Sequence, residues 1–169
     1  MDLHAYPDRV TLGGMADEHS GQPLAQTPNP PQLDWTQPDW FLQSLVNLTN
    51  AGDGTVEIGM ILLVDGFLVS GMMVGGARYF EGFAKEFASG FTDQAVAETI
   101  RTSFSEYGEI YKTDAADPLS PPPSPSYVHM RDARFFNTAG NPVPGNRGVW
   151  WRGRLSEVSG FVVGTLGAG

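Results

Sequence analysis

The stretch 55-TVEIGMILLVDGFLVSGMMVGG-76 decides the fold, because two apolar runs flank the dipeptide Asp65-Gly66. A two-residue turn of type I′ needs a positive φ at both central positions, and Asp-Gly adopts that conformation at little steric cost. The sequence therefore predicts an antiparallel hairpin. Pairing across the turn predicts one fully apolar face, with the pairs Val64–Phe67, Leu62–Val69, Met60–Gly71 and Ile58–Met73. The opposite face is mixed, so we expect helices to cover part of it.

A helix is predicted before this hairpin, over residues 36–52. Thr36 is the predicted N-cap, Pro38 lies in the first turn, and Gly52 ends the helix. Apolar residues recur on one face of this segment, as in a helix that packs against a core.

Two further helices are predicted after the hairpin. Residues 78–91 carry a phenylalanine stripe with helical spacing, formed by Phe80, Phe83 and Phe87. Such a stripe is typical of a core-facing helix, and a partner-docking face is the alternative. The next segment begins with Thr92 as its predicted N-cap, and its stripe consists of Val96, Ile100, Phe104 and Tyr107.

The C-terminal third predicts three strands. Their ranges are 127–136, 149–155 and 160–166, with a loop over 137–148. In the second of these, VWWRGRL, alternation places Trp151 and Leu155 toward the core.

The same alternation places Trp150, Arg152 and Arg154 together on the other face of that strand, with Arg131 as a neighbour on the strand before. Tryptophan beside arginine is an adhesive combination in an acidic protein, because exposed cation–π contacts are each worth about 0.5–1 kcal/mol. These four residues are our predicted interaction site. Packing of the same side chains under the inserted helices is the alternative.

Two segments have the composition of disordered chain. Residues 1–35 contain scattered glycine and proline with few large apolar side chains, and five of the fourteen residues in 113–126 are proline. We therefore expect a disordered N-terminal tail, followed by a single α+β domain over 36–169 that contains a flexible proline-rich linker at 113–126.

Composition narrows the classes of partner and compartment. The net charge of −9 disfavours binding to nucleic acid or to anionic membrane surfaces. The chain has no cysteine, which excludes disulfides and thiolate metal sites and fits a cytoplasmic protein. Its longest apolar run is far shorter than the roughly 20 residues of a spanning helix, and no signal peptide is visible.

Catalytic and cofactor motifs are missing from the sequence. The three histidines do not have the spacing of a metal site, and His129 is predicted to be a structural or surface residue. No nucleophile elbow, P-loop or dinucleotide-binding fingerprint is present. We predict no catalytic, metal-binding or cofactor-binding residue and no cofactor, so the chain is expected not to be an enzyme.

The order of strands resembles small barrels of the Sm-like and SH3-like type, with "DG", "HMRDARFF" and "WWRGRLSEVSG" in succession. The resemblance implies a strongly bent antiparallel sheet or small barrel of about five strands, with helices inserted after the second strand. The predicted class is α+β. A nucleic-acid-binding module of the Sm-like type is one alternative function, and an uncharacterised hydrolase is another.

A second resemblance covers about residues 40–166. The blocks "DGFLVSGMMVGGARYFEGFAKEF", "YVHMRDARFF" and "VWWRGRLSEVSGFVVGTL" are similar, in order and spacing, to the gas-vesicle accessory protein U (GvpU) family. The resemblance implies a cytoplasmic accessory protein that acts in vesicle assembly or clustering through self-association. It implies the gas-vesicle shell or other gas-vesicle accessory proteins as partners. The long N-terminal tail and the proline-rich linker depart from the family pattern.

Overall fold

The computed structural model describes residues 37–112, 124–137, 140–145 and 147–166. The predicted tail at 1–35 and most of the predicted linker at 113–126 lie outside the described residues. Residues 124–126 at the end of that linker are described. There the Pro125 carbonyl accepts a hydrogen bond from Gln43 Nε2 at 3.1 Å, and the Ser126 carbonyl accepts one from the Leu155 amide at 3.0 Å.

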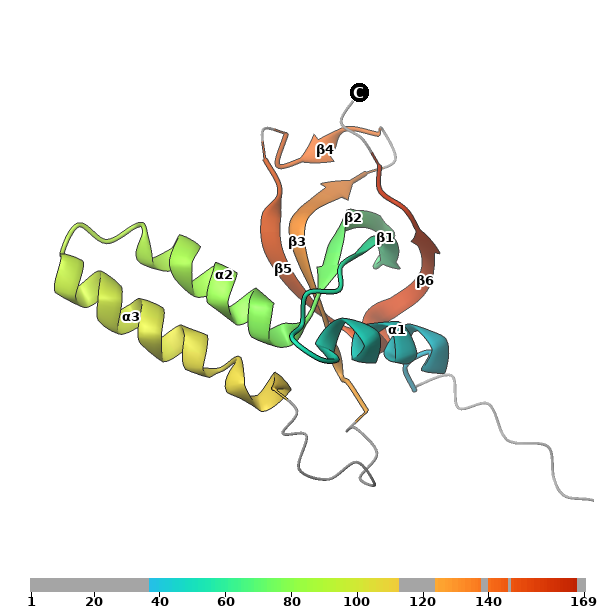
Figure 1. The fold of residues 1–169 in the computed structure, drawn as a ribbon. Coiled ribbons are helices and arrows are strands. Elements are labelled where there is room, and N and C mark those ends of the chain that lie inside the picture. The colour runs from blue at the N-terminus through green and yellow to red at the C-terminus, as the bar shows by residue number, and fades with distance from the viewer. Residues whose placement is uncertain (1–36, 113–123, 138–139, 146, 167–169) are drawn as a thin grey trace, which may run out of the picture. The chain divides into compact units, whose positions relative to one another are not determined.

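Six strands form one sheet with antiparallel pairing (Figure 1). The sheet order is β4-β3-β2-β1-β6, and β5 pairs with β3 beside β4. The strands are β1 (Ile58–Val64), β2 (Phe67–Val74), β3 (Tyr127–Phe136), β4 (Pro142–Val143), β5 (Val149–Arg154) and β6 (Val158–Val163).

The β1–β2 hairpin has the predicted register. Ile58 pairs with Met73 and Val64 with Phe67, and the two pairs predicted between them are also present. Asp65 has φ 50° and Gly66 has φ 82°, as a two-residue turn with two positive φ angles requires. The prediction from Asp65-Gly66 is therefore confirmed.

The sheet is bent but open, which corrects the barrel alternative. Within the described chain, no pairing joins β6 to β4 or β5, so the sheet keeps two ends. The Sm-like or SH3-like type is likewise not established by this topology. The two-residue strand β4 lies inside the predicted loop at 137–148. Two residues, one of them proline, are too few to show the alternation that predicts a strand.

The bend in β3 has a local cause. The pairing of β3 shifts register on both sides near residues 131–133, and Asp132 has φ 52°. A bulge of this kind inserts an extra residue and increases the local twist. It lets the first half of β3 pair with β5 and the second half pair with β4.

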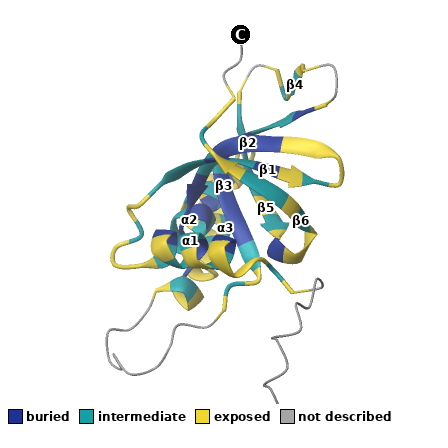
Figure 2. Ribbon diagram, turned by 90° about the vertical axis from the view of Figure 1, so that its right-hand side faces the viewer, coloured by how far each residue is buried: buried dark blue, intermediate teal, exposed yellow. Residues whose placement is uncertain are grey.

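The main core lies between the inner face of the sheet and helix α1 (Trp40–Asn50). Leu155 is buried and Trp151 packs against the same cluster, as the alternation in VWWRGRL predicted. The buried members of the core cluster are Leu42, Val46, Met60, Leu62, Val69, Met73, Val128, Met130, Ala133 and Leu155. Figure 2 shows this burial along β2 and β3, whereas the β1–β2 turn is exposed.

Both predicted N-caps are wrong, because the residue that caps each helix lies further along the chain than predicted. Helix α1 is capped by Asp39, whose carboxylate accepts from the amides of Phe41 and Leu42 at 2.9 Å. Helix α3 (Gln94–Glu106) is capped in the same way by Asp93 rather than Thr92. In each case an aspartate side chain accepts hydrogen bonds from first-turn amides, and an acidic residue is favourable at this end of the helix dipole.

Helices α2 (Gly76–Ala88) and α3 are inserted between β2 and β3, as predicted, together with the short 3₁₀ helix η1 (Glu109–Tyr111). Helix α2 lies between α3 and the strands (Figure 1), and α3 buries none of its residues. A second 3₁₀ helix, η2 (Leu155–Glu157), joins β5 to β6.

The phenylalanine stripe packs mainly on α3 instead of entering the main core. Phe83 and Phe87 lie 6.0 and 5.3 Å from the ring of Phe104, and Phe80 lies 5.9 Å from Tyr107. Phe87 remains 46% exposed. The prediction that this stripe faces the main core is therefore wrong: Phe80 and Phe83 are half-buried between the helices, and Phe87 is exposed.

Candidate interaction site

The outer face of β3 and β5 carries the predicted interaction residues. Antiparallel pairing places His129 opposite Arg152 and Tyr127 opposite Arg154. Because side chains alternate along a strand, these four residues lie on one face of the sheet, away from the main core. Helix α2 covers part of this face, so its residues have different environments.

His129 is enclosed by aromatic rings. Only 1% of its surface is exposed, and its ring lies 4.8 Å from Tyr79, 5.1 Å from Tyr111 and 6.0 Å from Phe80. Burial, together with the charge of Arg152, lowers the pKa of His129 from 6.5 to about 3. The residue is therefore neutral near pH 7, and of the two predicted alternatives it is structural.

Arg152 lies between the surface and the His129 cage, the aromatic rings of Tyr79, Tyr111 and Phe80 that enclose His129. Its guanidinium lies 3.6 Å from the centre of the Tyr127 ring, and its Nε donates to His129 Nε2 at 3.2 Å. Nε2 must then be unprotonated, so neutral His129 carries its proton on Nδ1. In the described part of the chain, Nδ1 is buried without a hydrogen-bond partner.

Trp150 packs against helix α2. A Cβ placed on Gly82 would lie 2.0 Å from Trp150 Cζ2, so the indole fits only because residue 82 has no side chain. Tyr79 meets the same indole edge-on, with 6.0 Å between ring centres. Trp150 thus links the inserted helices to the sheet. This contact agrees with packing under the inserted helices, the alternative to an exposed interaction site.

Arg131 takes part in an ion-pair network. Its Nε and Nη2 donate to the two carboxylate oxygens of Glu57 at 2.9 and 2.6 Å, and it also pairs with Asp132. Arg78 contacts Glu57 as well, at 2.8 Å. Hydrogen bonding from Arg131 is the largest effect that lowers the pKa of Glu57, and the two arginine charges act in the same direction.

The four predicted residues therefore share one face without forming one continuous exposed patch. Arg152 and Arg154 are exposed, Trp150 is half-buried under α2, and Arg131 is held by acidic neighbours. An isolated glycine within a predicted helix was the available signal for the Trp150 contact, because glycine in a helix interior costs about 1 kcal/mol relative to alanine. The sequence contained no comparable signal for the His129 cage.

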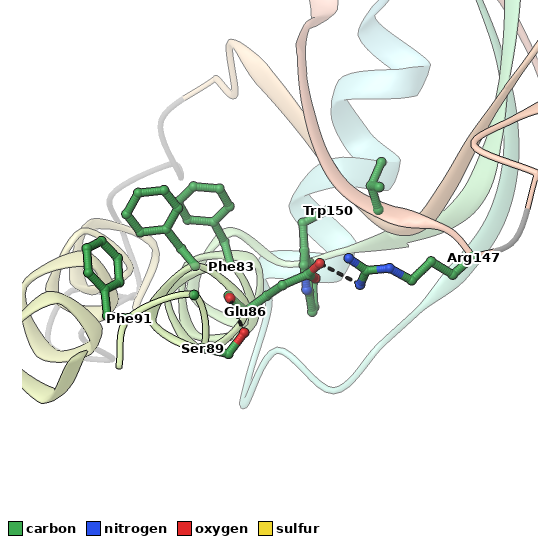
Figure 3. A pocket seen from close by; sticks show the side chains of 9 residues that line it. Phe83, Glu86, Ser89, Phe91, Arg147 and Trp150 are labelled. Atoms are coloured by element: carbon green, nitrogen blue, oxygen red, sulfur yellow. Dashed lines mark hydrogen bonds and ion pairs between the residues drawn. The ribbon is translucent and has the colours of Figure 1, made fainter. Parts of the chain in front are cut away.

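A pocket of about 550 Å³ opens between the C-terminal half of α2 and the start of β5 (Figure 3). Its apolar lining comes from Phe83, Phe87, Phe91, Val149 and Trp150. Arg147 and Glu86 also line it and form an ion pair of 2.6 Å.

Besides Trp40, Phe41 and Leu48 on α1, most exposed large apolar side chains of the described residues fall into two groups. The first, which we call the helix-pair surface, consists of Phe87, Phe91, Val96, Tyr107 and Ile110. The second, the sheet-end surface, consists of Leu63, Phe67, Leu68, Val162 and Val163. Figure 1 shows α3 and β6, which carry members of these two groups, on opposite sides of the strands.

The described residues contain neither a cluster of metal ligands nor a membrane-spanning helix. Among them, no three side chains of the ligand types His, Asp and Glu come together in a way that could hold a metal ion. None of the described helices combines the length and the apolar character that crossing a bilayer demands.

Together these features define an α+β protein with an open, bent antiparallel sheet and an inserted helix pair. The chain belongs to the GvpU-like family, because the family model described as Gas vesicle protein GvpU-like matches residues 39–166. This match confirms the resemblance seen in the sequence and indicates a gas-vesicle accessory protein. The family is not known as one of enzymes. Neither a curated protein nor a solved structure matches the chain.

Proposed function

We propose that the chain is a non-enzymatic accessory protein that promotes gas-vesicle assembly or clustering in the cytoplasm. It does so by associating with itself and by contacting the vesicle shell or other accessory proteins. Family membership supports the link to gas vesicles. The observation that carries the mechanism is that exposed apolar side chains occur both on the inserted helices with the segments that follow them and on β1, β2 and β6, on opposite sides of the strands.

Clustering requires a molecule with at least two contacts that can be made at the same time. A chain with one adhesive surface only coats a particle, whereas a chain with two can join particles, and multivalency then strengthens weak contacts. Exposed apolar groups of this kind commonly mark protein interaction sites. We assign the helix-pair surface to the shell or an accessory partner and the sheet-end surface to self-association.

The predicted arginine contacts belong to the same proposal. Arg152 and Arg154 supply positive charge beside the helix pair, and the chain as a whole is acidic. They would contact acidic groups on a partner. Trp150, which packs on α2, and Arg131, which pairs with Glu57, would stabilise the face that presents these arginines. The net charge of −9 and the pairing of Arg131 with Glu57 and Asp132 favour a protein partner over a nucleic acid, because phosphates would be repelled by the chain as a whole.

The test uses the full-length chain and purified gas vesicles. We expect the protein to be recovered with the vesicles after centrifugation and to increase their light scattering by clustering. Ile110→Asp should reduce recovery several-fold, because Ile110 is 79% exposed on the helix-pair surface and a charge there opposes apolar docking.

Val143→Asp is the matched control, since Val143 is also exposed and lies on β4, outside the helix pair that the Ile110→Asp variant tests. The control should bind as the natural chain does. Failure of the natural chain to bind or cluster vesicles would reject the proposed function. Equal binding by the Ile110→Asp variant would remove the helix-pair surface from it.

A further inference from the structure

Strand β6 ends the sheet and offers a free backbone edge. It pairs with β1 on one side, and no described strand pairs with its other side. Val162 and Val163 are 61% and 66% exposed. An edge of this kind presents a row of unpaired amide and carbonyl groups to any strand of matching length.

The sequence of β6 lacks the features that protect edge strands. Its six residues, VSGFVV, include no charged residue and no proline. Strand β5, by contrast, carries Arg152 and Arg154. Charged side chains, prolines and very short length are usual means of blocking strand addition, and β6 has none of them. The one irregularity in its pairing is a register shift at Ser159, opposite Leu63 and Val64, which leaves Gly160–Val163 as the regularly paired part of the strand.

The alternation of backbone hydrogen bonds along β6 shows which of its amide and carbonyl groups are not bonded to β1 and could pair with another strand. The Gly164 amide donates to the Gly59 carbonyl at 2.7 Å, just beyond the end of the strand. In an antiparallel pair, residues alternate between those bonded to the neighbour and those whose polar groups point away. Val162 and Gly160 are therefore directed toward β1, and Phe161 and Val163 direct their amides and carbonyls to the free edge.

We propose that β6 pairs antiparallel with β6 of a second copy of the chain, about a two-fold axis at Phe161. This inference rests on the proposed function, because it names the surface and the partner of self-association. In this register Phe161 lies opposite Phe161 of the second copy, and Gly160 lies opposite Val162 of the second copy. The two six-stranded sheets would join into one continuous sheet.

Three observations favour a second copy as the occupant. The edge is self-complementary, because the two-fold register pairs outward-pointing backbone groups with one another. It brings no like charges together, because Gly160–Val163, the regularly paired part of β6, contains no charged residue. A two-fold contact also closes on itself and yields a defined dimer, whereas pairing β6 with a different edge would continue into an open chain.

The first test measures the mass of the full-length chain by sedimentation velocity. We expect a dimer for the natural chain and at least tenfold weaker association for Val163→Lys, because a lysine would occupy the free edge. Val143→Lys is the matched control, since Val143 is 58% exposed at the other end of the sheet. Circular dichroism and melting temperature confirm that each variant folds.

The second test locates the contact without disrupting it. The natural chain has no cysteine, so a Gly160→Cys/Val162→Cys variant carries the only thiols. A Cβ on Gly160 meets no atom within 4 Å, and Val162 is exposed, so both changes should be tolerated. Directly opposed residues in a non-hydrogen-bonded pair have Cα atoms about 4.5 Å apart, which suits a disulfide.

Under mild oxidation we expect the double variant to form a covalent dimer and each single variant to stay monomeric on a denaturing gel. A monomeric natural chain, or a dimer that Val163→Lys leaves intact and the cysteine pair does not trap, would overturn the proposal. Vesicle binding is scored separately. Val163→Lys should still bind vesicles but cluster them poorly, whereas loss of binding by the natural chain would refute the proposed function itself.

Discussion

The indole of Trp150 lies directly on Gly82 of helix α2, in the space that a side chain at position 82 would fill. This contact couples β5 to the inserted helix pair. It also explains why a glycine is found within α2 despite its poor helix propensity.

Gly82→Ala should destabilise the protein by about 1–3 kcal/mol, the usual range for inserting a group into a packed site. The gain in helix propensity, about 1 kcal/mol, is smaller than the cost of displacing a tryptophan. Urea unfolding measures the effect. In a Trp150→Ala background the same change should become neutral or stabilising, because the obstructing ring is gone. Equal losses in both backgrounds would show that the contact is unimportant.

His129 should make stability depend on pH between about 5 and 7.5. Its pKa is lowered to about 3 in the folded chain and is near 6.5 when unfolded, so the unfolded state binds more protons as the pH falls. The stability is complete above pH 6.5 and is lost progressively as the pH falls from there toward 3. Linkage gives a loss of about 2 kcal/mol between pH 7.5 and 5.

His129→Gln is the comparison, since glutamine can still accept the Arg152 hydrogen bond but does not titrate. Its free energy of unfolding should be nearly flat over this pH interval. Asp53, Glu57 and Glu98 all have pKa values lowered below their ordinary range, so their contributions are lost at more acidic pH. Parallel pH curves for the two proteins would contradict the buried, neutral state of His129.

Arg131→Ala should cost about 1–3 kcal/mol, because it removes two charge-assisted hydrogen bonds to Glu57, a carboxylate with 16% side-chain exposure. Arg101→Ala is the control. It removes an equally short pair with Glu98, but both of those side chains are well exposed on α3, so the expected loss is under about 1 kcal/mol. Chemical denaturation of the two variants decides whether burial makes this difference.

Arg154→Glu should weaken recovery with purified vesicles without lowering the melting temperature. Arg154 is exposed on the face shared with Arg152, and no described contact of its guanidinium holds the fold together. Lys112→Glu makes the same change in net charge at another exposed site, beyond the end of η1, and serves as the control. Recovery that falls equally in both variants would show that only net charge matters.

The local elements of this protein were predictable from sequence because their causes are local. Asp65-Gly66 specified the turn and the register of the hairpin, and apolar spacing located the three helices. The N-caps were misplaced because Thr36 and Asp39, or Thr92 and Asp93, can each begin a helix. Sequence alone does not compare the hydrogen-bond geometry of such neighbours.

The sequence by itself thus determined the hairpin, the helix pair, the sides of VWWRGRL and, through its motif blocks, the family. Only the tertiary structure decided that the sheet stays open, that His129 is caged, and which predicted residues remain exposed. The physical reason is that these properties depend on groups distant along the chain. Tyr79 and Tyr111, which enclose His129, come from α2 and η1 in the inserted segment, and Glu57, which pairs with Arg131, lies 74 residues away in the chain. A strand is an edge strand only if no other strand pairs with its free side, and that depends on the whole sheet.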